Sequence, residues 1–117
     1  MDTRSDLGRR GEDAAAALFR SLGYKIIARN CRLPGGELDL VARRGSELVF
    51  CEVKTRSTDR FGEPGHAVNH VKQARIRRLA AAWLAANRMR GHEIRFDVVS
   101  VLARGPEVTV IHLKGAF

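Results

Sequence analysis

Residues 47–55 form a stretch with the composition of a buried β-strand, yet the stretch contains two charged side chains, Glu52 and Lys54. Side chains alternate between the two faces of a strand, so Glu52 and Lys54 are expected on the same face as Phe50. A strand this apolar belongs at the centre of a sheet, where a charged side chain is costly unless it is paired or ligated. The rest of the chain is therefore expected to supply partners for these two residues.

The run just before this strand, residues 37–43, supplies another carboxylate. Apolar and charged residues alternate there, which predicts a strand with Asp39 on the face opposite its two leucines. If residues 44–46 form a turn between two antiparallel strands, Asp39 comes to lie beside Glu52 and Lys54. Two carboxylates and a lysine are then expected to meet in one small region.

Glu12 adds a carboxylate from an expected helix over residues 9–22. It lies on the apolar stripe that contains Phe19, so it is expected to face the sheet from the first helical turn. A negative side chain in that turn also interacts favourably with the helix dipole, by about 0.3–1 kcal/mol, and this is an alternative role for it. Its convergence with Asp39 and Glu52 favours a functional role.

The remaining periodicities complete an α/β order within a single domain of 117 residues. Further strands are predicted over 24–30, 94–102 and 108–114, and a second helix over 66–89. Residues 1–7 are expected to form a loose tail, and the Gly- and Pro-containing segment 57–65 a loop. The predicted order is α-β-β-β-α-β-β, with a central mixed sheet of about five strands, the first three antiparallel, flanked by helices.

Oxygen ligands of this kind suit a hard divalent cation such as Mg²⁺ or Mn²⁺, which accepts one or two carboxylates together with water and phosphate. The alternative is a buried ion-pair network of Asp39, Glu52 and Lys54, and such networks contribute little to stability. His66 and His70 have the spacing of metal ligands on a helix, but without an obvious third ligand we interpret them as exposed helix residues.

The charge balance indicates a polyanionic partner, because 21 Lys+Arg oppose 13 Asp+Glu and give a net charge of +8. No apolar run approaches the ~20 residues of a membrane span, and the two cysteines form no CxxC pair, so a cytoplasmic protein is expected. An aromatic content of 6% offers few stacking platforms, which favours duplex or branched DNA over single strands. The residues predicted to contact phosphates are Arg29, Arg32, Arg56, Lys72, Arg75 and Arg78.

Several of these stretches together resemble a known family. They are GE at 11–12, RN at 29–30, GELDL at 36–40, FCEVKTR at 50–56, FG at 61–62, Lys72 and RFDVV at 95–99. From Gly8 to about Leu102 the chain resembles the bacterial YraN family, also known as the uncharacterised family UPF0102. Within it, Asp39 followed by Glu52-Val53-Lys54 is similar to the PD-(D/E)XK signature of nucleases. The early helix that carries Glu12 is similar to that of archaeal Holliday-junction resolvases.

This resemblance implies a restriction-endonuclease-like fold and hydrolysis of phosphodiester bonds in DNA with Mg²⁺ or Mn²⁺. Asp39 and Glu52 would hold the metal together with the backbone carbonyl of Val53. Lys54 would orient the attacking water or stabilise the charge that develops at phosphorus, and Glu12 would complete or adjust the metal site. The sequence departs from the signature because no proline precedes Asp39. This departure is common in the superfamily.

Structure-specific cleavage of branched or junction DNA, in repair or recombination, is the activity that the resemblance implies. A homodimer would provide two sites for the two strands of a junction, although the sequence shows no specific interface. The alternative is a nucleic-acid-binding protein that keeps the nuclease fold without turnover. The complete set of Asp39, Glu52 and Lys54 favours the enzyme, because a protein that only binds DNA has no need of carboxylates in a cationic groove.

Overall fold

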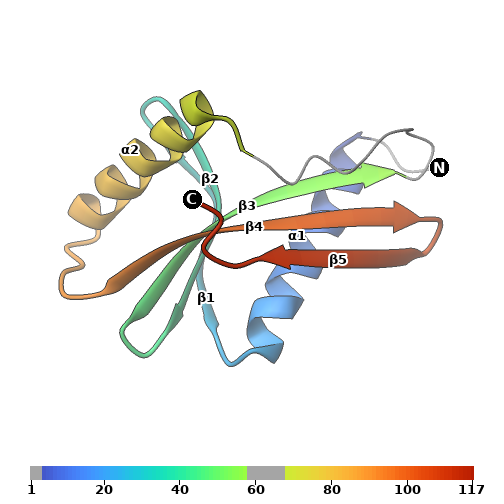
Figure 1. Cartoon of the computed structure of the whole chain (residues 1–117), viewed down its shortest axis with the longest axis horizontal. Helices are drawn as coiled ribbons and strands as arrows, with labels where there is room; N and C mark the ends of the chain where they lie inside the picture. The colour runs from blue at the N-terminus through green and yellow to red at the C-terminus, as the bar shows by residue number, and fades with distance from the viewer. Residues whose placement is uncertain (1–3, 58–67) are drawn as a thin grey trace.

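The computed structural model describes residues 4–57 and 68–117, in which two helices lie on opposite faces of a five-stranded sheet (Figure 1). The elements are α1 (Arg4–Ser21), β1 (Lys25–Leu33), β2 (Gly36–Arg44), β3 (Glu47–Ser57), α2 (His70–Ala86), β4 (Glu93–Arg104) and β5 (Glu107–Leu113). This confirms the α/β order predicted from the sequence. Neither helix of the described residues is long and apolar enough to cross a membrane.

The strands lie side by side in the order in which they occur in the chain, β1-β2-β3-β4-β5. All neighbouring strands are antiparallel except β3 and β4, which are parallel. The connection that contains α2 returns the chain to the end of the sheet where β3 begins, so β4 starts beside the start of β3. Figure 1 shows the arrows of β3 and β4 pointing the same way. β3 is the central strand of this mixed sheet, as its apolar sequence predicted.

Two hydrophobic clusters cover the two faces of β3. Phe50 packs on the side of α2, where Trp83 meets its ring edge to face at 5.7 Å between centroids. Val49 and Cys51 pack on the side of α1 with Phe19. The alternation predicted for this strand is therefore confirmed up to Cys51, and it directs Glu52 and Lys54 to the side of α2.

Helix α1 begins earlier than the sequence indicated. We predicted a loose tail over residues 1–7, which is wrong for residues 4–7 because they form the first turn of the helix. Asp6 contributes a negative charge to that turn and pairs with Arg9 at 3.7 Å, both of which favour a helical start. Residues 1–3 lie outside the described part of the chain.

The end of α1 follows from a glycine, Gly23. Gly23 has φ 89°, its N–H donates to the carbonyl of Arg20, and the N–H of Tyr24 donates to the carbonyl of Phe19. These two bonds form a Schellman motif, which a glycine in this conformation accommodates without strain. Leu22, the last residue of the predicted helix, lies just beyond α1 and is 42% exposed.

Helix α2 is shorter at both ends than the predicted range 66–89. Asn69 is its N-cap and accepts a hydrogen bond from the N–H of Lys72 at 2.8 Å. The helix ends at Ala86, because Asn87 is the C-cap and Arg88 adopts a left-handed φ of 52°. Residues 58–67 lie outside the described part of the chain, and with them the predicted loop beyond Ser57 and the predicted His66.

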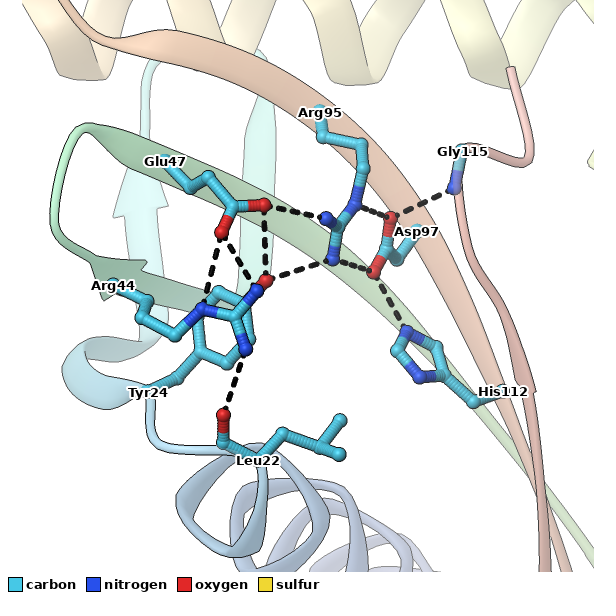
Figure 2. Close-up of polar contacts among 8 residues, drawn as sticks. All are labelled: Leu22, Tyr24, Arg44, Glu47, Arg95, Asp97, His112 and Gly115. Atoms are coloured by element: carbon cyan, nitrogen blue, oxygen red, sulfur yellow. Dashed lines mark hydrogen bonds and ion pairs between the residues drawn. The ribbon is translucent and has the colours of Figure 1, made fainter.

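A buried ion-pair network ties the starts of β3 and β4 to the end of α1 (Figure 2). Asp97, fully buried, accepts two hydrogen bonds from Arg95 and one from the N–H of Gly115, and its Oδ2 lies 2.7 Å from His112 Nε2. Arg95 also pairs with Glu47 at 2.9 Å. The pairing of Asp97 with Arg95 gives this aspartate a structural role in the sheet.

Candidate functional site

The carboxylates of Asp39 and Glu52 meet where β2 separates from β3. The last backbone pair of that ladder is Leu40 with Cys51. Beyond it, the N–H of Val53 donates to Oδ2 of Asp39 at 2.9 Å, and Glu52 lies close enough for its charge to raise the pKa of Asp39. Two carboxylates this close repel each other, so this carboxylate pair favours a proton on Asp39.

The surroundings of the carboxylate pair raise the pKa of Asp39 to about 7. Burial of the side chain is the largest cause, followed by the negative charge of Glu52, and Glu12 raises the pKa further. The hydrogen bond from Val53 opposes these effects but does not outweigh them. The site is therefore short of positive charge, which a bound cation would supply.

One detail of β2 differs from the prediction. Leu38 packs in the cluster under α2, whereas Leu40 packs in the cluster under α1, so the two leucines do not share a face. The strict alternation fails because β2 pairs with β3 only from Leu40 onward, whereas the residues before Leu40 pair only with β1 in their hairpin. Asp39 lies between the two leucines, at the point where this change occurs.

Glu12 reaches the site from α1, and a residue of β1 holds it there. The side-chain amide of Asn30 donates to Oε1 of Glu12 at 3.0 Å. Asn30 has a left-handed φ of 48°, and its neighbours Arg29 and Cys31 pair with the residues on either side of Asp39. The register therefore places Asn30 opposite Asp39 on the neighbouring strand.

A glycine allows α1 to approach the sheet at this point. A Cβ on Gly11 would lie 1.8 Å from Oγ1 of Thr55 and under 3 Å from two of its carbons. Because such contacts are impossible, any larger residue would lift the first turns of α1 away from β3. The close approach places the neighbouring Glu12 within electrostatic reach of Asp39.

Two lysines lie near Glu52. Lys54, on the same strand, has a lowered pKa because of burial and because of the positive charge of Lys72, while Glu52 opposes that shift. Lys72, from the first turn of α2, forms an ion pair with Glu52 at 2.6 Å between Nζ and Oε1. We predicted Lys72 as a phosphate contact, and the structure places its ammonium on a carboxylate of the site itself.

The other predicted phosphate contacts lie on several elements around the site. Arg29 pairs with Asp13 of α1 at 2.7 Å, and Arg32 pairs across the β1–β2 hairpin with Glu37 at 3.5 Å. Arg75 and Arg78 are exposed on α2, and Arg56 is half-buried on β3. The Arg75 side chain lies beside Gly36, so α2 and the hairpin bring part of this basic surface together.

The donor set fits a cation that takes few protein ligands. Within residues 4–57 and 68–117, no three His, Cys, Asp or Glu side chains are arranged to hold a metal ion by themselves. This disfavours a closed zinc site but not Mg²⁺ or Mn²⁺, which bind through one or two carboxylates and otherwise keep water or phosphate. The partly buried carboxylate pair, with its raised pKa for Asp39, supplies the hard oxygen atoms that such a cation needs.

Three contributors to this site were not assigned from the sequence. Asn30 was noted only within the family resemblance, and nothing in its sequence context indicates a hydrogen bond to Glu12. Asn69, the N-cap that fixes Lys72, has an ordinary capping signal, because asparagine before a helical pattern is typical of this position. Gly11 could be assigned only once Thr55 was known to lie against it.

Comparison with known proteins identifies the family. Residues 11–101 match the model of the uncharacterised protein family UPF0102. A UPF0102 protein of Beutenbergia cavernae is 49% identical over 116 residues, which cover 98% of each chain. A UPF0102 protein of Frankia casuarinae is 51% identical over 119 residues, covering 100% of each chain, and one of Moorella thermoacetica is 49% identical over 117 residues, covering 98% of each. The chain therefore belongs to the UPF0102 family.

Proposed function

We propose that this protein is a metal-dependent endonuclease that hydrolyses phosphodiester bonds in DNA with Mg²⁺ or Mn²⁺. The observation that carries the proposal is the partly buried carboxylate pair of Asp39 and Glu52, in which the pKa of Asp39 is raised and which lies beside Lys54. A protein gains no stability from two acids forced together in this way, so the pair is better explained by a cation that binds between them. Structure-specific cleavage of branched DNA is the activity that we expect from the family resemblance.

Each residue has a role that its position supports. Asp39 and Glu52, with the carbonyl of Val53, would hold the cation, and a bound cation would acidify its water and neutralise charge on the phosphate. Lys54 would orient the attacking water or stabilise the charge that develops at phosphorus. Glu12, held by Asn30, would adjust the cation site from the side of α1.

The positive charge of the chain supports a nucleic-acid substrate. A net charge of +8 favours a polyanion, and the exposed arginines of α2 lie on the helix that also presents Lys72 to Glu52. These side chains would position the phosphate backbone without reading its sequence. A binding protein that retains the fold without turnover is the second candidate, and the same experiment separates the two.

The test is a cleavage assay with Mg²⁺ or Mn²⁺ on labelled linear, flapped and four-way DNA, with RNA of matched structure as a further arm. We expect the wild-type protein to cleave DNA, and Glu52→Gln and Lys54→Met to lose about 10²-fold or more in rate while keeping the wild-type circular dichroism spectrum. Glu107→Gln, on β5, is the matched control and is expected to cleave like the wild type.

Two outcomes would overturn the proposal in different ways. Binding without cleavage on every substrate would identify a binding protein that only retains the fold. Cleavage that survives in both Glu52→Gln and Lys54→Met would show that the activity does not come from this site. Faster cleavage of RNA than of the matched DNA would correct the substrate class and leave the assigned residues in place.

A further inference from the structure

The Lys72–Glu52 ion pair places an ammonium group on one of the carboxylates that we assign to the cation. The two charged atoms are 2.6 Å apart, and only 12% of the Glu52 side chain is exposed against 40% of the Lys72 side chain. Glu52 thus has two charged neighbours, the amine of Lys72 from α2 and the carboxyl group of Asp39 from β2. Oε1 of Glu52 cannot bind both the ammonium group and a metal ion.

The position of Lys72 is built into the start of α2. Its N–H donates to the N-cap side chain of Asn69 at 2.8 Å, which fixes the first helical turn. Gln73 donates from its side chain to the carbonyl of Val68 at 2.7 Å, and Val68 is itself buried in the core beneath α2. The backbone that carries Lys72 is therefore anchored on both sides, unlike that of a lysine on a mobile surface.

Lys72 is not needed to make the fold. The contacts that hold α2 on the sheet are apolar, from Ile76, Leu79 and Trp83, and they begin one turn after Lys72. An ion pair of this exposure contributes only ~0–1 kcal/mol to stability. Its position on Glu52 is more readily explained by what Glu52 does.

We propose that the Lys72 ammonium is a built-in counter-ion, which occupies Glu52 in the metal-free protein and competes with the divalent cation for that carboxylate. The inference rests on the proposed function, because it requires a cation at Glu52. When a cation binds, the ammonium group leaves Glu52 and becomes available to the phosphate that the cation attracts. Lys72 is thus a positioning residue that sets how readily the site accepts metal.

The test measures Mn²⁺ affinity by titration calorimetry without DNA, at fixed pH and ionic strength. Lys72→Met is expected to bind Mn²⁺ about fivefold more tightly than the wild type, because the competing ammonium group is gone. Lys72→Arg keeps a cation within reach of Glu52 and is expected to stay near the wild-type affinity. Lys25→Met, exposed at the far end of β1, removes the same charge away from the site and measures the effect of net charge alone.

A second readout is the rise in melting temperature that Mn²⁺ causes, which is expected to be larger for Lys72→Met than for the wild type. Lys72→Gln, which keeps a polar side chain, replaces Lys72→Met if circular dichroism shows that the methionine variant is misfolded. Equal affinities for Lys72→Met and Lys25→Met would overturn the counter-ion role and leave the proposed function intact. If neither the wild type nor any variant binds Mn²⁺ or Mg²⁺, the metal site itself is overturned, and the counter-ion role with it.

Discussion

Two aspartates of the sheet, the partly buried Asp39 and the fully buried Asp97, have opposite surroundings. Burial and the neighbouring Glu52 raise the pKa of Asp39 to about 7. Burial also disfavours the charge of Asp97, but hydrogen bonds from Arg95, Gly115 and His112 outweigh it and lower the pKa of that carboxyl. Asp97 therefore stabilises the fold as an anion, whereas Asp39 in the metal-free protein is better accommodated in its protonated form.

The raised pKa of Asp39 gives a stability prediction for the metal-free protein. The folded state holds this proton up to about pH 7, whereas the unfolded chain releases it near the ordinary aspartate pKa of 3.8. The stabilisation of the folded state by this proton is thus complete below about pH 4. It is lost as the pH rises from 4 to about 7. Asp39→Asn mimics the protonated form at every pH. Its advantage over the wild type should grow between pH 4 and 7 and level off on the order of 4 kcal/mol in urea unfolding.

Asp97→Asn is the control for that measurement and should behave in the opposite way. At neutral pH it removes the charge that compensates Arg95, which costs about 3–5 kcal/mol when a buried pair is broken. Because the pKa of Asp97 is lowered in the folded state, this loss should shrink as the pH falls below about 4. An Asp39→Asn variant that is less stable than the wild type at pH 8.5 would contradict the strained carboxylate pair.

At the scale of the elements, the packing of α1 on β3 determines where Glu12 lies. Gly11→Ala would place a Cβ 1.8 Å from Oγ1 of Thr55, so the helix must shift. We expect a loss of about 1–3 kcal/mol in urea unfolding, and weaker Mn²⁺ binding because Glu12 moves with the helix.

Gly8→Ala, one turn earlier, is the matched substitution in the same helix. A Cβ on Gly8 would have no atom within 4 Å, so alanine should be neutral or stabilise α1 by up to about 1 kcal/mol. If Gly11→Ala also proved neutral in stability and in Mn²⁺ affinity, the close contact with Thr55 would not be what positions Glu12.

Most elements of this fold could be predicted because their signals are local. The alternation within β3 and the helical spacing around Trp83 each depend on one short stretch of chain. The ion pair of Lys72 with Glu52 and the hydrogen bond of Asn30 to Glu12 could not be predicted, because they join residues 18 or more positions apart. The helix boundaries were missed for a different reason: first turns and caps depend on single residues, which a periodic pattern does not resolve.

At the scale of the whole molecule, the net charge of +8 is unevenly distributed. Lys54 and Lys72 are associated with the carboxylates of the site, and Arg29, Arg44 and Arg95 are each paired with an acid. The guanidinium group of Arg77 lies over the ring of Phe96, so part of the Arg77 side chain packs at the edge of the core. Arg75 and Arg78 remain exposed on α2, so this helix is the surface on which we expect phosphate contacts.

This distribution predicts how DNA binding depends on salt. Each phosphate contact that is lost should reduce the slope of log K against log salt concentration by about 0.9, because one fewer counterion is released. Arg75→Gln and Arg78→Gln should each do so, and the loss in affinity should be similar for unrelated DNA sequences, since phosphate contacts do not read bases.

Fluorescence anisotropy in EDTA, which prevents cleavage, measures the slope. Lys25→Gln removes an equal charge at the far end of β1 and should leave the slope unchanged. If all three variants shifted affinity equally, the DNA would be responding to net charge alone rather than to a surface on α2.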